Sequence, residues 1–484
     1  MSSKVRRIDN VRIEVPIGYV PDMKVPGIIF IDPQLEQALE EEAIVQVANT
    51  ATLPGIVKAS MAMPDIHTGY GFAIGGVAAM DIDQDGVVSP GGVGYDINCG
   101  VRILRTNLTK DEIAPELKTL VNQLYRDIPS GVGSTGRIKL TKEDGREVFV
   151  DGSKWAVSRG YGDIEDIEHT ESKGCLEGAD PDEISNKAYE RGKSQLGTLG
   201  SGNHFLEIQY VDEVLDEATA NAFGLFPGQV TVMIHSGSRG MGHQVCTDFL
   251  VVMEKAVKKY GIQLPDKELA CAPFYSEEAQ HYLAAMRAAA NYAWANRQCM
   301  THWTREAFYR VLKISPASLG MRLVYDVAHN IAKEESYVVD GKKRRLIVHR
   351  KGATRAFGPQ GGGHSELPEV FRNTGQPVLI PGDMGRASYI LAGTSTAMDM
   401  TFGSACHGAG RLMSRHQAVR QSKGRAIAKE LEAQGIFVRS AGKRTLAEEI
   451  SEAYKDVSSV VDVVDAAGIA KKVVRLKPVG VVKG

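Results

Sequence analysis

Five side chains that commonly bind metal ions lie in short glycine-rich segments of this sequence. They are Asp96, Cys99, His204, His235 and His329. One thiolate, three imidazoles and one carboxylate suit a transition metal better than Ca²⁺ or Mg²⁺. Five donors exceed the four of one tetrahedral site, but a thiolate bridging two metals about 3.5–4 Å apart would use them all. Ligand softness alone favours Zn²⁺ over Mn²⁺.

Each of these residues also has a simpler explanation. A single cysteine is most often a small buried hydrophobe, and a buried histidine often serves only as a hydrogen-bonded group. Their shared position in glycine-rich segments favours a metal site. Spacing alone leaves both explanations open.

Another glycine-rich segment, 403–411 (GSACHGAGR), precedes a predicted helix. Small residues with free N–H groups at a helix start bind anions. His407 would face a phosphate held there and act as nucleophile or general acid–base. The alternative is an ordinary helix N-terminus capped by Ser404. The segment is not a Walker A loop, because GxxxxGK[ST] is absent.

Basic side chains near these segments suit the phosphates of an extended substrate, since guanidinium groups bind phosphate in bidentate fashion. The candidates are Arg239, Arg350, Lys351, Arg355 and the pair Arg411 and Arg415, which we expect on one helix face beside His407.

The composition excludes several classes of protein. The chain has 484 residues, a formal charge of −2 and 51 glycines, a glycine share above the usual level of about 7%. Its hydrophobic content excludes a disordered chain, and its near-zero charge argues against a protein that coats nucleic acid. Six cysteines without CxxC spacing predict reduced thiols and a cytoplasmic location. We expect no signal peptide and no membrane span.

Helices and strands that would position these segments alternate irregularly. Apolar periodicity predicts helices over 33–48 (N-cap Asp32), 111–127, 276–313 (broken near Arg297), 408–434 and 444–466, and strands over 203–210, 229–235, 321–328, 345–349 and 377–381. The mixture predicts an α+β or mixed α/β fold without regular βαβ units, and we expect α+β. We expect a single domain over 1–484 with a polar peripheral subregion at 128–182.

Several long motifs resemble the RtcB family of RNA-splicing ligases. They are GYDINCGVR (94–102), GSGNHFLEI (200–208), IHSGSRGMGHQ (234–244), DVAHN (326–330), HRKGATRAF (349–357), CHGAGR (406–411) and PVGVVKG (478–484). The resemblance covers essentially the whole chain. It implies a single RtcB-like domain with mixed sheets around a deep central cleft.

The resemblance implies a ligase that depends on GTP and two Mn²⁺ per chain. Such enzymes join RNA ending in a 3′-phosphate or 2′,3′-cyclic phosphate to RNA with a 5′-hydroxyl, in tRNA splicing and RNA repair. His407 resembles the guanylylated histidine. Asp96, Cys99 and His204 resemble the ligands of one metal, and Cys99, His235 and His329 those of the other.

The same resemblance implies the nucleotide contacts. They are Asn203, Phe205, Leu206, Glu207, Asn330, Pro381, Gly382, Asp383, Met384, Ser388, Gly408, Ala409, Gly410, Tyr454 and Lys483, the last two bordering the guanine. Asp383 and Arg386 differ from the residues common in relatives. Our candidates for holding RNA phosphates are Arg191, Arg239, Lys351 and Arg415.

The expected partners are RNA ends, including tRNA halves, and an archease-type activating protein, with the enzyme itself a monomer. Two other classes of function use part of the same residue set. A metal-dependent phosphoesterase or nuclease would need the metals but no covalent His407, and a non-catalytic RNA-binding protein would need neither.

Overall fold

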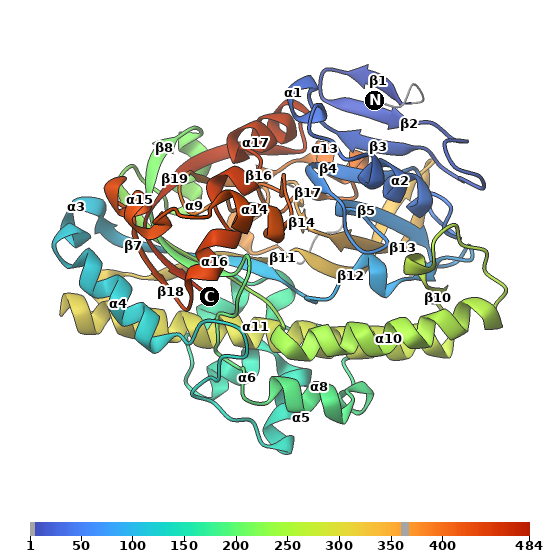
Figure 1. The fold of residues 1–484 in the computed structure, drawn as a ribbon. Helices are drawn as coiled ribbons and strands as arrows, with labels where there is room; N and C mark the ends of the chain where they lie inside the picture. The colour runs from blue at the N-terminus through green and yellow to red at the C-terminus, as the bar shows by residue number, and fades with distance from the viewer. Residues whose placement is uncertain (1–4, 360–366) are drawn as a thin grey trace.

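Two large β-sheets stand above a pair of long helices in the computed structural model, which describes residues 5–359 and 367–484 (Figure 1). The first sheet has the order β1 (Arg6–Asp9), β2 (Arg12–Val15), β3 (Gly27–Phe30), β4 (Ser60–His67), β5 (Ile74–Asp81), β13 (Lys342–Lys351), β12 (Asn330–Val339). The second has the order β11 (Arg322–Ala328), β7 (Gly100–Thr109), β9 (Gln229–Ser236), β8 (Phe205–Val214), β19 (Ala470–Lys483), β16 (Ser388–Gly393), β15 (Pro377–Ile380), with β18 (Phe437–Ser440) also on β19.

Two short strand pairings are separate from the two large sheets. They are β6 (Val87–Val88) with β10 (Ala272–Pro273), and β14 (Ala353–Arg355) with β17 (Ser404–Cys406). The pairing of β14 with β17 follows directly on β13 of the first sheet, so it attaches the segment containing His407 to that sheet. The predicted α+β class, without regular βαβ units, is confirmed.

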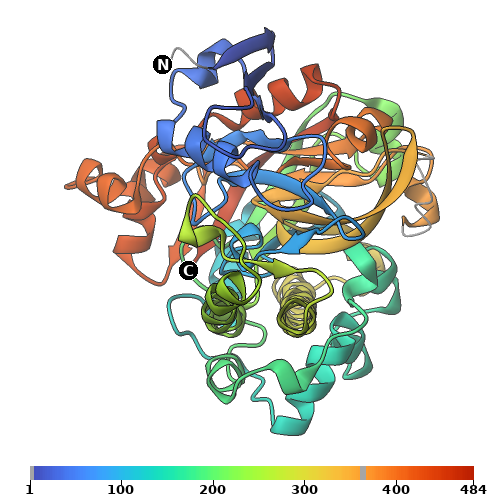
Figure 2. The same ribbon diagram turned by 90° about the vertical axis from the view of Figure 1, so that its right-hand side faces the viewer.

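The two long helices are α10 (Arg239–Lys259) and α11 (Glu277–Leu312), seen side by side and end-on in Figure 2. The predicted break of α11 near Arg297 is wrong. The Arg297 side chain is fully buried, and it donates to Asp326 (2.8 Å) and to the backbone oxygens of Asn98 (2.8 Å) and Ser236 (2.9 Å). Because its donors have partners inside the core, the helix continues past it. Within the described ranges, no helix is both long and apolar enough to span a membrane.

The other predicted helices are shorter than expected. Residues 33–48 form α1 (Pro33–Glu36) and α2 (Glu41–Thr50), and Asp32 caps α1 as predicted, accepting from the Leu35 N–H at 2.7 Å. The segments 111–127, 408–434 and 444–466 are divided likewise, into α3 (Lys110–Ile113) and α4 (Leu117–Asp127), α14 (Arg415–Gln421) and α15 (Ile427–Ala433), and α16 (Lys443–Glu448) and α17 (Val457–Ala466). Residues 408–414 form no helix.

The polar segment 128–182 lies below α11 (Figure 1). It carries α5 (Lys142–Asp151), α6 (Ser153–Ser158) and α7 (Ile164–Glu168). Its few large apolar residues, Leu140, Phe149 and Trp155, are buried in the same hydrophobic cluster as α11. The remaining helices, α8 (Asn186–Gly192), α9 (Glu217–Phe223), α12 (Pro316–Leu319) and α13 (Ser395–Met400), lie in connections between strands.

Strand register gathers the chemistry-bearing residues at one end of the second sheet. Gly100 of β7 pairs with both Ser236 of β9 and Ala328 of β11, so Cys99, His235 and His329 lie at neighbouring strand ends. Phe205 of β8 pairs with both His235 and Lys483 of β19, which brings His204 and Lys483 to the same end. Residues separated by hundreds of positions therefore meet at one edge.

Candidate active site

The carboxylate, the thiolate and one imidazole form a compact donor group. His204 Nε2 lies 2.8 Å from Asp96 Oδ2 and 3.5 Å from Cys99 Sγ. One donor atom from each of the three residues falls within 4.8 Å of the others. His204 Nδ1 lies 3.0 Å from the Leu199 carbonyl and 3.2 Å from Arg239 Nη1. A metal would take the other ring nitrogen, Nε2, which faces Asp96 and Cys99. These three predicted ligands therefore lie together.

The other two histidines lie beside the same thiol. His235 Nε2 is 3.1 Å from Cys99 Sγ, and the ring centroids of His235 and His329 are 5.5 Å apart. Both ring nitrogens of His329, and Nδ1 of His235, are buried without a hydrogen-bond partner among the described residues. A buried polar atom without a partner is costly, so the orphaned nitrogens of His329 fit a metal ligand, and His235 would bind through Nε2, which faces Cys99.

Burial favours the metal-binding form of the two histidines but opposes that of the thiol. Burial raises the pKa of the Cys99 thiol well above its ordinary value, and the neighbouring Asp96 adds to this. Burial also lowers the pKa of His235 and His329 well below the ordinary value, so both imidazoles are neutral. Metal binding would deprotonate the thiol and release a proton.

His407 lies next to this donor group, with its ring centroid 5.4 Å from that of His329. It follows strand β17, so the predicted helix start at His407 is wrong. The N–H groups of His407 and Gly408 donate to Asp65 at 2.9 and 3.3 Å, where an anion at a helix start was expected. The anion that these amides bind is therefore a carboxylate of the chain itself.

Asp65 also orients the His407 ring. Its Oδ2 lies 2.5 Å from His407 Nδ1, and its side chain is fully buried at the end of β4. Burial opposes ionisation of Asp65, but His407 and Lys455 outweigh it and hold its pKa below the ordinary value. An ionised carboxylate accepts the Nδ1 proton, which leaves the lone pair of Nε2 free.

Sequence reasoning missed Asp65, His67 and Lys455. His67 lines the pocket, and burial lowers its pKa to about 4. Lys455 donates to the Pro64 and Ile66 carbonyls on either side of Asp65, at 3.0 and 2.6 Å. The glycine-rich segment 64–76 was a signal for the first two residues, but nothing in the sequence pairs Asp65 with His407.

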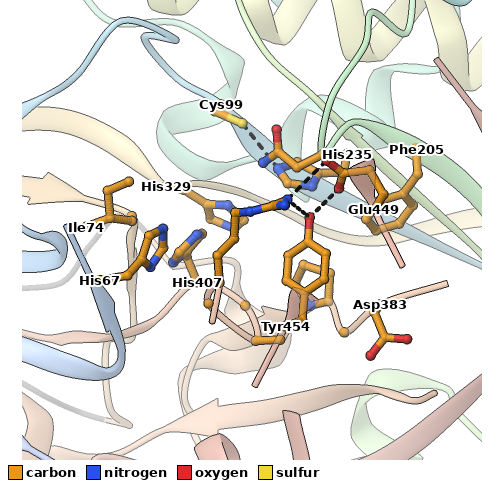
Figure 3. A pocket seen from close by; sticks show the side chains of 18 of the residues that line it. His67, Ile74, Cys99, Phe205, His235, His329, Asp383, His407, Glu449 and Tyr454 are labelled. Atoms are coloured by element: carbon orange, nitrogen blue, oxygen red, sulfur yellow. Dashed lines mark hydrogen bonds and ion pairs between the residues drawn. The ribbon is translucent and has the colours of Figure 1, made fainter. Parts of the chain in front are cut away.

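A pocket with a cavity volume of about 320 Å³ opens between the two sheets. Figure 3 shows His67, Ile74 and His407 on one side of it, and Phe205, Tyr454, Glu449 and Asp383 on the other. The predicted residues that line it are Cys99, Asn203, Phe205, Glu207, His235, His329, Asn330, Lys351, Pro381, Gly382, Asp383, Met384, His407, Gly408, Ala409, Gly410, Arg411, Arg415, Tyr454 and Lys483.

The side of the pocket away from His67 is aromatic and ionisable. Lys483 Nζ lies 5.5 Å from the Phe205 ring centroid and 3.5 Å from Glu449 Oε2. Glu207 is 2% exposed, and its carboxylate accepts a hydrogen bond from the Gln209 amide at 2.8 Å. Burial raises the pKa of Glu207 to about 7. A buried carboxylate beside aromatic rings suits a heterocycle that carries N–H donors.

Several predicted site residues have other positions. Leu206 is buried in the hydrophobic core and does not line the pocket. Ser388 supports the pocket from behind, since its hydroxyl accepts from the Gly382 N–H at 3.2 Å. Asp96 and His204 contact Cys99 but do not line the pocket, and the Asp96 side chain is partly exposed.

Of the four candidates for holding RNA phosphates, two line the pocket and two do not. Arg415, the first residue of α14, lines the pocket and is half exposed, whereas Arg191 binds the Gln244 amide oxygen at 2.9 Å. Arg239 Nη1 lies 3.2 Å from His204 Nδ1. Lys351 lines the pocket, but its ammonium group donates to the Tyr70 and Phe72 carbonyls, and burial lowers its pKa to about 7.

Three arginines expected near a substrate bind other groups of the chain, although Arg411 also lines the pocket. Arg350 and Arg355 are buried, and Arg350 forms a bidentate pair with Glu335 at 2.6 and 2.8 Å. Arg411 is not helical, so it shares no helix face with Arg415; it donates to the Tyr454 hydroxyl at 3.0 Å. The glycine-rich segment 349–363, which contains Arg350 and Arg355, extends beyond the described ranges from residue 360 onward.

The two unusual residues of the 381–388 loop contact each other. Arg386 Nε lies 3.3 Å from Asp383 Oδ2. Asp383 also accepts from the Ser451 hydroxyl, and Arg386 donates to the Lys455 and Ser451 carbonyls, each at 3.2 Å. The pair therefore fastens this loop to the segment that carries Tyr454.

Comparison with known proteins gives one consistent result. A family model described as tRNA-splicing ligase RtcB matches residues 46–484. The tRNA-splicing ligase RtcB of Archaeoglobus fulgidus is 57% identical over 484 residues, which is 100% of both chains. Proteins of the same name from Thermococcus kodakarensis and Methanococcus maripaludis are 57% and 53% identical, over 99% and 100% of both chains.

Proposed function

This chain belongs to the RtcB family of tRNA-splicing ligases, and from that premise we propose that it ligates RNA through a covalent His407–GMP intermediate. The observation that carries the proposal is the position of His407. Its Nδ1 is held by Asp65, and its ring lies 5.4 Å from the ring of a proposed metal ligand, His329. A nuclease or phosphoesterase would need the metal donors but no histidine oriented for attack.

In the first step, the unprotonated Nε2 of His407 attacks the α-phosphorus of GTP. An N–P bond forms, the bond to the β-phosphate oxygen breaks, and pyrophosphate leaves. Asp65 keeps the Nδ1 proton in place and stabilises the positive charge that develops on the ring. The buried carboxylate of Glu207 supports a preference for guanine, because N1–H and the 2-amino group of guanine are both donors. Adenine presents an acceptor at N1, which a carboxylate would repel.

In the next steps, an RNA 3′-phosphate oxygen attacks the phosphorus of the histidine-bound GMP, and His407 is released. The 5′-hydroxyl of the second RNA then attacks the activated 3′-phosphate, and GMP leaves. A 2′,3′-cyclic end is first hydrolysed to a 3′-phosphate. We assign Arg415 to these RNA phosphates, because it lines the pocket and is half exposed. The roles extend to RNA repair as well as tRNA splicing.

Two Mn²⁺ ions are the proposed cofactors, held by Asp96, Cys99 and His204 and by Cys99, His235 and His329. The orphaned nitrogens of His329 and the short contacts of Cys99 with His204 and His235 support this assignment. Bound metal would neutralise phosphate charge and orient in-line attack. An archease-type protein is the proposed activating partner, the enzyme acts as a monomer, and its proposed location is the cytoplasm.

Incubation with α-labelled GTP and Mn²⁺ tests the proposal. We expect an acid-labile label on the protein that is absent in His407→Ala. His281→Ala is the matched control, because His281 is a half-exposed histidine on α11 that pairs with Glu183. It should be labelled like the wild type.

Ligation of defined RNA ends completes the test. Joining should require a 3′-phosphate or cyclic phosphate and GTP, and it should fail with a 3′-hydroxyl or with ATP. An unlabelled wild-type protein with verified metal and nucleotide would overturn the proposal in favour of a nuclease or RNA-binding protein.

A further inference from the structure

An aromatic surface at the pocket rim has no part in the scheme above. It consists of Tyr70, Tyr95 and His243. Tyr95 stacks on His243 with ring centroids 4.8 Å apart and an interplanar angle of 28°, and Tyr70 meets Tyr95 edge-on at 5.6 Å. Tyr70 and Tyr95 line the pocket, and His243 is exposed on the first turns of α10. We infer that this aromatic surface stacks a terminal base of the RNA substrate.

The hydroxyl groups of the two tyrosines do not make the hydrogen bond that is usual for a buried tyrosine, among the described residues. A buried tyrosine normally donates its hydroxyl to a partner. Neither Tyr70 nor Tyr95 has a hydroxyl hydrogen bond among the residues that the structure describes, and both side chains are partly exposed. Both residues line the pocket, so their rings can meet a ligand there.

The loop that carries Tyr70 is held rigidly from several directions. The Gln46 side chain brackets Gly69, donating to its carbonyl at 2.7 Å and accepting from its N–H at 3.0 Å. The Gly71 N–H donates to Glu268 at 2.9 Å, and Lys351 Nζ donates to the carbonyls of Tyr70 and Phe72. A preorganised aromatic face binds with little loss of conformational entropy.

The position of this surface selects its ligand. Tyr95 directly precedes the proposed metal ligand Asp96, whereas the proposed guanine contacts Phe205, Tyr454 and Lys483 belong to other strands and loops of the pocket. A base stacked on Tyr95 would therefore place its phosphate near the metal donors while GTP occupies the guanine side. Aromatic stacking accepts any base, since every base has a π-face, which suits an enzyme that joins RNA ends of different sequence.

This inference rests on the proposed function and is tested by a double-mutant cycle. One partner is Tyr95→Ala, with Tyr95→Phe as the variant that keeps the ring. The other partner is the RNA, which carries an abasic nucleotide either at its 3′-phosphate end or at its 5′-hydroxyl end. Ligation is measured as kcat/KM per guanylylated enzyme, so that folding and metal loading are normalised. Tyr275→Ala is the matched control, because Tyr275 is an exposed tyrosine outside the pocket.

We expect Tyr95→Ala to lower kcat/KM about tenfold, in the range for loss of one stacked base, and Tyr95→Phe and Tyr275→Ala to retain activity. An abasic nucleotide at one of the two ends should cost wild type a similar factor and cost Tyr95→Ala almost nothing further. The RNA end at which the abasic nucleotide shows this coupling is the end whose base stacks on Tyr95. Additive losses in both arms, or wild-type activity of Tyr95→Ala, would overturn the inference. A wild-type enzyme that forms no label with GTP would instead overturn the proposed function.

Discussion

Replacing Asp65 by asparagine tests how His407 becomes a nucleophile. The substitution keeps the size of a side chain that is fully buried, but it removes the charge that lies 2.5 Å from His407 Nδ1. A hydrogen bond to a charged group contributes about 1.5–3 kcal/mol and a neutral one about 0.5–1.5 kcal/mol. The lost difference of about 1–1.5 kcal/mol alone corresponds to roughly tenfold in rate.

A second effect enlarges the loss. If the NH₂ of the introduced amide faces His407 Nδ1, the ring proton moves to Nε2, and the lone pair needed for attack is lost. The same change in a serine protease triad lowers the rate by about 10⁴-fold. We therefore expect guanylylation of His407 in the Asp65→Asn variant to be slower by about 10²–10⁴-fold.

The assay is single-turnover transfer of label from α-labelled GTP to the protein, with metal content and thermal unfolding measured on the same preparation. Because the pKa of Asp65 lies below its ordinary value, the carboxylate is ionised throughout neutral pH. Protonation of Asp65 should therefore add no pH dependence to the defect in that range. A folded, metal-loaded Asp65→Asn variant that is labelled at the wild-type rate would refute the assigned role of Asp65.

Three further outcomes are expected. The pKa of Glu207 is raised to about 7, so its carboxylate becomes protonated below that pH. GTP binding, measured by calorimetry, should therefore weaken as the pH falls through 7. Binding that does not change with pH would contradict the guanine contact. Cys99→Ala should lose both metals, and elemental analysis that still finds two per chain would exclude the bridging thiolate. Asp326→Ala leaves Arg102 and Arg297 buried without their carboxylate, so it should lower the free energy of unfolding by about 3–5 kcal/mol, and an unchanged denaturant midpoint would contradict this.

Local pattern was enough to predict some of the fold. Asp32 and Pro33 predicted a helix start that the structure confirms, because capping depends on neighbouring residues alone. The predicted break in α11 at Arg297 failed for the opposite reason. The partners that satisfy the Arg297 guanidinium, Asn98, Ser236 and Asp326, are distant in sequence, and no periodicity contains them.

In the candidate site, too, features that depend on local sequence were predicted, and features that depend on distant residues were not. Residue type and glycine context singled out His407 and the five proposed metal donors, and register brings these residues to one place. The role of Asp65 was not predictable, because it depends on β4 and β17 approaching each other across 342 residues of sequence. Arg350 looked like a phosphate ligand beside a glycine, but its partner Glu335 faces it from the adjacent strand β12.

The position of β19 has a consequence for how this protein is made. This strand pairs with both β8 and β16 inside the second sheet and also carries Lys483 into the pocket, yet it follows every other strand in chain order. While the ribosome is still translating the preceding residues, β8 and β16 each have an unpaired edge, and such edges promote association with other chains. Long-range pairing of this kind also folds slowly. Nascent or prematurely terminated chains are therefore the form of this protein most exposed to aggregation, and they lack the side chain that completes the guanine side of the pocket.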